Sequence, residues 1–345
     1  MSKVSVDFSA ALGKVKPMHG VNNGPKTTGF FRDTSRWFRE AGFPYARLHD
    51  TEYPFGSGAF VDIPCIFKDF NADPDDPASY DFTQTDLYLK AICDTGCKPF
   101  YRLGVSIEHT PVRRNVYAPA DPVQWARICA GIVRHYNEGW ADGYHMDIEY
   151  WEIWNEPEGE GTWRTNMWIG TNEQFYELYA TAATILKKEF PNIRVGGFGS
   201  CGFYYLTRGD KGYYGKFMEF AEDFFKYIRE KNAPLDFFSW HIYTKDPTEV
   251  EVHARHARAL MDKYGYTRAE SILDEWNWAG DGYDWMETEQ GAALNAAMEI
   301  TMQRESVDVA TYYDAQPVIP YCGIFRLTDL TPTKAYYSLY YWNRL

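Results

Sequence analysis

Short apolar runs that end in polar residues alternate with helical patterns along the whole chain, which is typical of repeated β–α units around a parallel sheet. Eight such strands, each followed by a helix, predict an α/β fold, a closed (β/α)8 TIM barrel, with a doubly wound open sheet as the alternative. No linker interrupts the units, so we predict a single domain over residues 1–345. The expected strands cover residues 15–22, 45–50, 98–106, 150–157, 194–200, 236–244, 270–278 and 307–316.

The segments between the strands carry helix-start signals. A capping side chain is followed by an early acidic or amide partner, or by a proline in the first turn. The capping candidates are Thr83, Asp121, Thr171, Asp246 and Thr331. In the helix after Thr171 the apolar residues share one stripe, which predicts the face that packs on the sheet. A last helix over residues 331–342 is expected to close the ring.

The composition argues against two classes of partner. The chain has 35 Lys and Arg against 48 Asp and Glu, a formal charge of −13. This surplus repels phosphate backbones and no Lys/Arg stripe reverses it, so we expect no nucleic-acid partner. No run approaches the ~20 apolar residues of a membrane-spanning helix, so we expect no membrane span.

The start of the chain and its cysteines bear on compartment and cofactors. Residues 1–7 contain no apolar signal segment, which as written predicts a cytoplasmic bacterial protein, or a periplasmic or secreted one if a leader was removed. The six cysteines are scattered and lack zinc-site spacing, so we interpret them as buried or free thiols. We expect neither a metal nor an organic cofactor.

Polar residues at the carboxyl ends of barrel strands are candidates for chemistry, because barrel enzymes build their sites on that face. The fourth strand ends in Asn155 and Glu156, and Pro157 stops it. The seventh ends in Asp274 and Glu275, and side-chain alternation predicts that only one of these two acids points to the barrel axis. A closed barrel would bring Glu156 and Glu275 to opposite sides of one cavity.

Two carboxylates that face each other across a sugar-sized cavity suit glycoside hydrolysis. Aromatic rings near the strand ends could stack on sugar faces, although we expect most of them to fill the core and only a few to touch a ligand. The tryptophans in or just beyond strand ends are Trp154, Trp163, Trp168, Trp240, Trp276, Trp278 and Trp285.

Four motifs carry a family resemblance. They are Trp-Asn-Glu-Pro at 154–157, Glu-Trp-Asn at 275–277, Arg-Leu-His-Asp at 47–50 and Ser-Trp-His-Ile-Tyr at 239–243. Together they resemble the retaining barrel glycosidases of clan A, closest to glycoside hydrolase family 39, over essentially the whole chain. In that family a β-sandwich usually follows the barrel; this sequence ends after its last expected helix, so we expect the barrel alone.

The resemblance implies roles for individual residues. Glu156 would be the acid/base and Glu275 the nucleophile. Asn155 would donate to the sugar 2-hydroxyl, while Arg47 and Tyr243 would hold the nucleophile ionised. An ionised nucleophile should in turn raise the pKa of the acid.

Further residues would line the sugar pocket. The resemblance places His49 and His241 there, and Asp50, Trp276 and Trp278 are additional candidates for substrate binding. Asp314, at the end of the eighth strand, is a weaker candidate for binding sugar hydroxyls.

We therefore predict a retaining glycoside hydrolase that cleaves a neutral sugar from an oligo- or polysaccharide and is β-xylosidase-like. An α-L-arabinosidase or β-galactosidase acting on a plant glycan is the alternative within this class. A non-catalytic carbohydrate-binding barrel is the alternative from another class. The separation of the Glu156 and Glu275 carboxyl groups decides between catalysis and binding alone: about 5 to 5.5 Å supports retention, roughly 6.5 to 9.5 Å supports inversion, and a clearly larger distance supports neither.

Several competing motifs have simpler interpretations. Residues 197–202 match G-x-G-x-x-G, but a Tyr- and Gly-rich loop is expected after them, so we interpret the glycines as room for close packing. His253 and His256 suit a solvated helix face better than a metal site. Glu158 and Glu160, on the loop after the fourth strand, could replace Glu156 as the acid, but we expect them to be exposed loop carboxylates. Glu152 is expected to be a buried barrel acid with a hydrogen-bonding partner.

Overall fold

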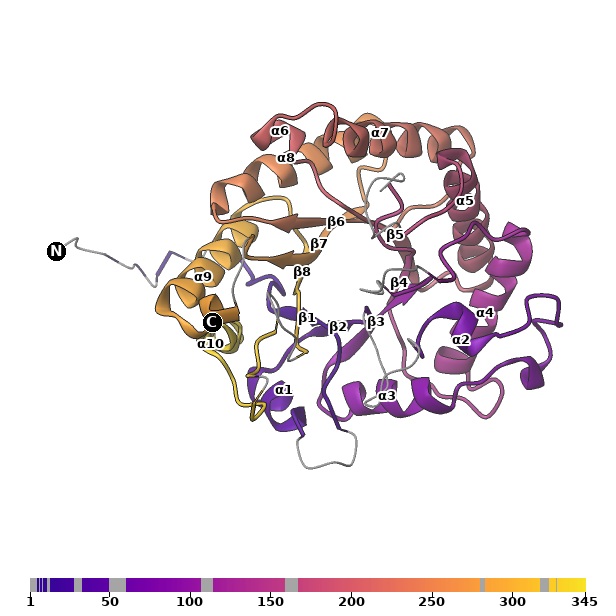
Figure 1. Ribbon diagram of the computed structural model, residues 1–345, viewed down its shortest axis with the longest axis horizontal. Coiled ribbons are helices and arrows are strands. Elements are labelled where there is room, and N and C mark those ends of the chain that lie inside the picture. Colours follow the sequence, from indigo (N-terminus) through magenta and orange to yellow (C-terminus); the bar gives the residue numbers. More distant parts are fainter. Residues whose placement is uncertain are drawn as a thin grey trace.

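The computed structural model describes residues 5, 7, 9–10, 13–27, 33–49, 60–106, 114–158, 167–279, 283–316, 323–326 and 328–345. Eight parallel strands form a closed barrel in chain order, and β1 pairs with β8 (Figure 1). The predicted barrel is confirmed and the open sheet is wrong. The strands are β1 (Gly20–Asn22), β2 (Tyr45–Arg47), β3 (Lys98–Leu103), β4 (Tyr150–Ile153), β5 (Arg194–Ser200), β6 (Phe237–Tyr243), β7 (Glu270–Asn277) and β8 (Val309–Tyr312).

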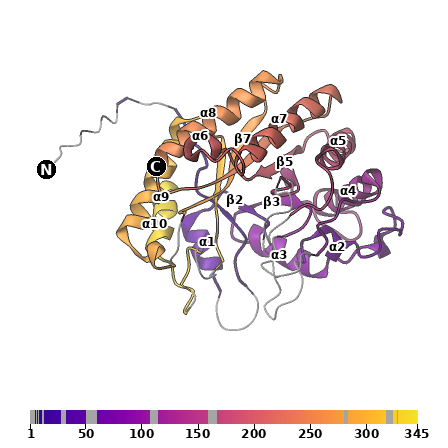
Figure 2. The ribbon, with the colours of Figure 1, turned by 45° about the horizontal axis from the view of Figure 1, so that its top comes forward.

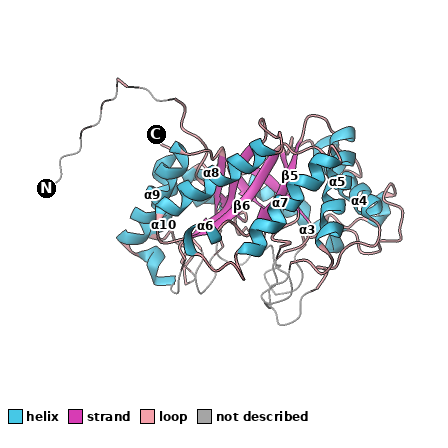
Figure 3. Ribbon diagram, turned by 90° about the horizontal axis from the view of Figure 1, so that it is seen from above, coloured by secondary structure: helices cyan, strands magenta, loops and turns pink. Residues whose placement is uncertain are grey.

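Helices surround this barrel, as the tilted and side views show (Figures 2 and 3). Within the described residues, no helix has the length and apolar content needed to cross a bilayer. The helices are α1 (Ser35–Ala41), α2 (Ile63–Ile66), α3 (Thr83–Cys93), α4 (Pro122–Glu138), α5 (Asn172–Glu189), α6 (Tyr205–Arg208), α7 (Gly215–Glu230), α8 (Pro247–Lys263), α9 (Glu289–Arg304) and α10 (Lys334–Trp342), with 3-10 turns η1 (Pro77–Ser79) and η2 (Tyr283–Glu287).

All eight predicted strands exist, and all but β5 are shorter than predicted. The carboxyl-end residues that were included in the predictions leave the sheet ladder and become loops. The polar strand ends singled out in the sequence therefore lie at the rim of the barrel, where their side chains can turn toward a common centre.

Three of the five predicted caps are confirmed. Asp121 and Asp246 accept backbone N–H groups of α4 and α8, and Thr171 forms a full capping box with Gln174 at the start of α5. The other two are wrong. The cap position of α3 is Phe82, one residue before Thr83, and α10 begins only at Lys334, so Thr331 lies outside it.

The apolar stripe of α5 packs inward as predicted. All of its members are buried except Ile185, which is partly exposed. Removing a side chain of this size from water contributes roughly 1.5–3 kcal/mol, so the stripe fixes α5 firmly against the barrel. The buried members are Phe175, Leu178, Tyr179, Ala182 and Leu186.

Inside the barrel, an apolar layer closes the amino-terminal half. The rings of Phe100 on β3 and Phe237 on β6 lie 5.5 Å apart although these strands are not neighbours, so they meet across the interior. Tyr150, Ile272 and Val309 complete this separate cluster. Because side chains alternate along a strand, residues two positions further on face the same interior, one layer closer to the carboxyl ends.

Candidate active site

The layer above the apolar cluster is polar, and Arg47 on β2 is at its centre. Its Nε lies 2.7 Å from Glu152 and 2.9 Å from Asp274, and its Nη2 donates to Asn155 Oδ1 at 2.6 Å. The side chain is fully buried. Burial opposes the charge, but the carboxylates of Asp274, Glu152 and Glu275 outweigh it, so the pKa of Arg47 is raised further. One cation thus organises residues from β4, its following turn and β7.

Three side chains contact the Glu275 carboxylate. The Tyr243 hydroxyl donates to Oε1, Arg47 Nη1 lies 3.4 Å from Oε2, and His49 Nε2 lies 3.3 Å from the same oxygen. The carboxylate is almost completely buried, with 5% of its side chain exposed. These contacts are the ones that the family resemblance implies for Arg47 and Tyr243, and they fix the position of the carboxylate.

Both acids at the end of β7 point inward, so the prediction that only one does is wrong. In the pairing with β6, Trp240 faces Leu273 while the next residue, His241, faces Glu275. Asp274 is therefore the extra residue of a β-bulge, which breaks the alternation. Its carboxylate reaches Arg47, and its other oxygen lies 3.6 Å from His241 Nε2.

Asp274 shares the Arg47 guanidinium with Glu152, the buried barrel acid predicted from the sequence. Glu152 also accepts a hydrogen bond from Ser239 Oγ at 2.6 Å. Burial raises its pKa to about 8, with Asp274 adding to the rise and Arg47 opposing it. The pKa of Asp274 is lowered to about 2, because Arg47 and His241 outweigh its burial. Glu152 is thus the neutral member of this pair at neutral pH.

Glu156 follows β4 on a turn with φ 46°, and its backbone N–H donates to Gly199 O at 3.0 Å. Its Oε1 lies 2.7 Å from His241 Nδ1. Burial acts to raise the pKa of Glu156, but the hydrogen bond and charge of His241 outweigh it and the pKa is lowered. The expectation of a raised pKa for Glu156 is therefore wrong, because the proton is held on the partner.

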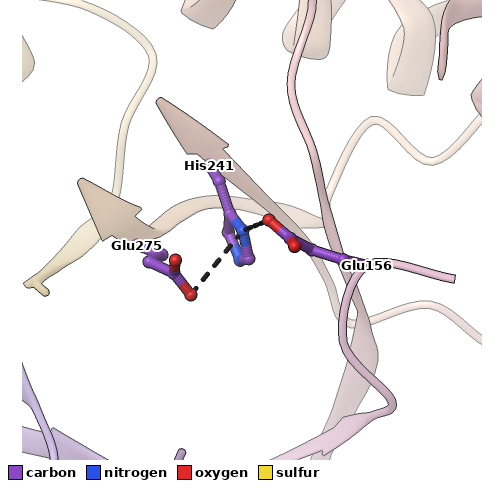
Figure 4. A group of neighbouring side chains, drawn as sticks. All are labelled: Glu156, His241 and Glu275. Carbon is purple, nitrogen blue, oxygen red and sulfur yellow. Dashed lines mark hydrogen bonds and ion pairs between the residues drawn. The ribbon is translucent and has the colours of Figure 1, made fainter. Parts of the chain in front are cut away.

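That partner is the imidazole of His241. Burial acts to lower its pKa, but Glu275, Asp274 and Glu156 raise the pKa well above the usual histidine value. Figure 4 shows the ring between the two glutamates, with its Nδ1 2.7 Å from Glu156 and 3.7 Å from Glu275. His241 and Glu156 therefore share one proton, next to the Glu275 carboxylate.

The two candidate carboxylates are close together. One oxygen of Glu156, one oxygen of Glu275 and a ring nitrogen of His241 all lie within 4.8 Å of one another. Ion pairs among these groups account for the cluster, and Arg47 adds a buried positive charge against Glu275 that would repel a cation. Such a spacing leaves little room for a water between the carboxylates and suits direct attack by one of them.

The remaining predicted pocket residues divide into three groups. Asn155 is buried, and its amide nitrogen has no hydrogen-bond partner among the described residues, so it can donate to a ligand. Asp50 lies outside the described residues, as does Trp163. Asp314 is buried and accepts a hydrogen bond from Asn23, which leaves its sugar-binding role a prediction.

Trp276 and Trp278 differ from each other. Trp276 is fully buried and meets Tyr312 edge-on, so the prediction that it binds substrate is wrong: its side chain lies in the core and offers no surface to a sugar. Trp278 is partly exposed, stacks on Trp285 at 3.6 Å and lies 4.5 Å below Lys245 Nζ. Its role in substrate binding stays a prediction. Trp154, Trp168 and Trp240 are buried in the core.

The burial of Glu158 was not predicted from the sequence. It was expected to be exposed, yet it is 2% exposed. Its Oε1 accepts hydrogen bonds from Ser200 Oγ at 2.8 Å and from the Cys201 N–H at 2.5 Å. Burial raises its pKa to about 7, with a contribution from Glu156. Its partners come from the end of another strand, so no local signal could reveal them. Glu160 lies outside the described residues.

The glycines of residues 197–202 make close packing possible, as predicted. Gly199 has φ +60°, and a Cβ there would lie 3.0 Å from both Asn155 Oδ1 and His241 Nε2. A short helix, α6, occurs within the segment expected to be a loop. The expectation of a solvated face at His253 is wrong, since it is fully buried and burial lowers its pKa to about 3.

Comparison with known proteins identifies a family. The model of the glycosyl hydrolases family 39 matches residues 3–272. A curated β-xylosidase of Geobacillus stearothermophilus is 24% identical over 318 residues, which cover 84% of this chain and 56% of that protein. The β-xylosidase of Caldicellulosiruptor saccharolyticus is 23% identical over 260 residues, 71% of this chain and 46% of that protein. The chain thus spans about half the length of these relatives.

Solved structures agree in fold. The glucosidase from Croceicoccus marinus superposes with a TM-score of 0.77 and 27% identity, covering 96% of this chain and 67% of that one. The monomeric β-xylosidase from Caulobacter crescentus CB15 gives a TM-score of 0.64 at 17% identity, covering 90% of this chain and 64% of that one. The second likeness concerns the fold alone.

Proposed function

The chain belongs to glycosyl hydrolases family 39, and from this premise we propose that it is a retaining glycosidase that releases a neutral sugar through a covalent glycosyl-enzyme. The observation that carries this proposal is the approach of the Glu156 and Glu275 carboxylates to within 4.8 Å. Retaining glycosidases hold this pair about 5 to 5.5 Å apart, whereas inverting ones need roughly 6.5 to 9.5 Å for the attacking water.

The first half of the reaction forms the intermediate. A Glu275 oxygen attacks the anomeric carbon while the bond from that carbon to the leaving oxygen breaks. Glu156 takes the proton from His241 and passes it to the leaving oxygen. The Asn155 amide nitrogen, which has no hydrogen-bond partner among the described residues, would donate to a sugar hydroxyl.

The second half releases the sugar. Glu156, now unprotonated, takes a proton from a water molecule, whose oxygen attacks the anomeric carbon and displaces Glu275. Two inversions at one carbon give net retention. Glu156 has 22% of its side chain exposed, so it can meet this water, whereas Glu275 has only 5% exposed.

A β-xyloside is the first choice of substrate, because both curated relatives carry the name β-xylosidase. A β-glucoside is the second, since the 27% identical solved structure is a glucosidase. The two sugars differ by the hydroxymethyl group on C5, so the pocket around that carbon sets the choice. α-L-Arabinosides and β-galactosides remain alternatives.

A panel of aryl glycosides tests the proposal. Wild type and Glu275→Gln are assayed side by side on β-xyloside, β-glucoside, α-L-arabinoside and β-galactoside, and the first-formed anomer is identified by proton NMR. We expect one sugar to be released with retained configuration by the wild type alone. Glu138→Gln is the matched control, because Glu138 is exposed at the end of α4, on the opposite face of the barrel.

Two outcomes would overturn the proposal. Release of the inverted anomer would contradict the mechanism, and turnover by Glu275→Gln equal to that of the control would contradict the nucleophile. Saturable binding of a xylo-oligosaccharide, without release of sugar by the folded wild type, would favour the non-catalytic carbohydrate-binding barrel.

A further inference from the structure

Four hydrogen bonds attach the turn that carries Glu156 to the end of β5. The Glu156 N–H donates to the carbonyls of Phe198 and Gly199, at 3.2 and 3.0 Å. Two residues later, the Glu158 carboxylate accepts from Ser200 Oγ and the Cys201 N–H. The backbone of residue 156 and the side chain of residue 158 therefore hold the same turn against the end of β5.

The hydrogen bonds alone do not require a carboxylate at residue 158. Both of them end on Oε1, and the amide oxygen of a glutamine could accept them equally well. The second oxygen, Oε2, is buried without a hydrogen-bond partner among the described residues. Burying an unsatisfied carboxylate oxygen is costly, so the position carries an ionisable group where a neutral one would form the same contacts.

This ionisable group lies close enough to Glu156 for their charges to interact. Burial raises the pKa of Glu158 to about 7, and the negative charge on Glu156 adds a smaller rise. Glu158 therefore gains its charge near neutral pH. By the reciprocity of linked titrations, that charge favours retention of the proton held by Glu156 and His241.

We propose that Glu158 is a positioning residue for the proton donor: it fixes the Glu156 turn against the end of β5, and its negative charge keeps the proton of the Glu156–His241 pair in place at alkaline pH. This inference rests on the proposed function for its meaning in catalysis, but the effect on the pair is a property of the protein alone. Glu158 acts only through the Glu156–His241 pair.

Other titratable and charged groups also face the Glu156–His241 pair, and they contribute to its pKa in the wild type. They come from the ends of β2, β5 and β7 and from the segment around α6. They are Arg47, His49, Cys201, Tyr204, Tyr213, Asp274 and Glu275. None of them is altered in the variants below, so a change in the pair can be assigned to residue 158.

The first test is the pH dependence of kcat/KM on the best aryl substrate of the panel. In Glu158→Gln the alkaline limb should move to lower pH by roughly 0.5–1.5 units, the size expected for removing one nearby negative charge. The acidic plateau should stay within about twofold of wild type. Glu158→Asp keeps the charge and should restore most of the limb. Ser200→Ala removes one hydrogen bond but no charge and should leave the limb in place.

A second measurement needs no turnover. The His241 imidazole is titrated by NMR in protein carrying labelled histidine, with its signal assigned from His241→Asn. Its midpoint should fall by the same amount in Glu158→Gln. Glu158→Met, a neutral residue of similar length, provides a second chargeless variant if the glutamine form does not fold, as judged by circular dichroism.

An unchanged His241 midpoint in the folded chargeless variant would overturn the inference, even if the protein hydrolyses nothing. A loss of activity that is uniform across pH would also overturn it, because that is the signature of a purely structural contact. Failure of the proposed function would be visible separately, as an inactive wild type whose His241 midpoint still responds to residue 158.

Discussion

The ends of β4 and β7 hold the two candidate carboxylates in different ways. Glu275 accepts hydrogen bonds from Tyr243 and Arg47, lies within ion-pair distance of His49 and leaves 5% of its side chain exposed. Glu156 lies beyond the sheet ladder, contacts His241 through one hydrogen bond, and leaves 22% exposed. The first carboxylate is held by side chains from β2 and β6, and the second depends on one neighbour and its turn.

This difference matches what two half-reactions demand of two chemically similar groups. A nucleophile must stay at one position relative to the anomeric carbon, so fixed donors favour it. An acid that later becomes a base must exchange a proton with a leaving oxygen and then with water, so it needs access and a partner that holds a proton. Environment, and not residue type, assigns the two roles.

The largest expected effect separates the two carboxylates by leaving group. Glu275→Gln should lower turnover ~10⁴-fold or more with every leaving group, because the covalent bond cannot form. Glu156→Gln should lower kcat/KM, which reports the first half-reaction, ~10²–10⁴-fold with a poor leaving group, but far less with dinitrophenol, which departs without a proton. Initial rates on nitrophenyl and dinitrophenyl glycosides measure both.

Equal losses on both substrates in Glu156→Gln would remove the distinction between the two strand ends. The folded state of each variant is checked by thermal unfolding, with the exposed Glu138→Gln as the reference.

The next effect concerns the cation that organises the β7 side. Arg47→Met would remove the buried guanidinium charge that pairs with Asp274 and Glu275, and we expect the free energy of unfolding to fall by about 3–5 kcal/mol. Denaturant unfolding measures it. Arg255→Met is the matched control, because Arg255 is 63% exposed and its ion pair with Glu305 should be worth no more than about 1 kcal/mol. Similar losses in both variants would contradict the central role of Arg47.

A smaller effect depends on pH. Burial raises the pKa of Glu152 from 4.5 to about 8, so between these values the folded chain holds a proton that the unfolded chain has lost. The contribution of this group to stability must therefore fall as pH rises through that window. Glu152→Gln stays neutral, so its stability relative to wild type should improve by about 1–3 kcal/mol from pH 5 to pH 8.

Thermal unfolding at several pH values provides this measurement. Glu149→Gln is the control, because Glu149 is 33% exposed and lies at the opposite, amino-terminal end of β4. A constant difference between Glu152→Gln and wild type across the window would show that Glu152 is ionised throughout.

The smallest effect tests the rim beside Glu275. Trp278→Ala should raise KM by roughly 3–10-fold with little change in kcat, because a stacking surface is worth about 0.5–1.5 kcal/mol. Trp276→Phe should leave KM unchanged and lower only the melting temperature, since Trp276 lies in the core. Steady-state kinetics on the preferred glycoside separate the two, and an unchanged KM in Trp278→Ala would remove this residue from the pocket.

Much of this arrangement could be predicted from the sequence, because it depends on local order. The alternation of apolar runs and helical stripes located all eight strands, and the position of Glu152 inside the fourth strand predicted a buried barrel acid. The residues at the ends of β4 and β7 stood out because barrel strands present their carboxyl ends at one face.

The remainder depended on contacts between distant segments. The bulge that turns both Asp274 and Glu275 inward arises from the register between β6 and β7, which a strand pattern does not contain. Burial of Glu158 requires the end of β5, and burial of Trp276 requires Tyr312 on β8. The proton on His241 likewise follows from the summed negative charge of Glu275, Asp274 and Glu156. Only the folded barrel brings these groups together and so determines which group holds the proton.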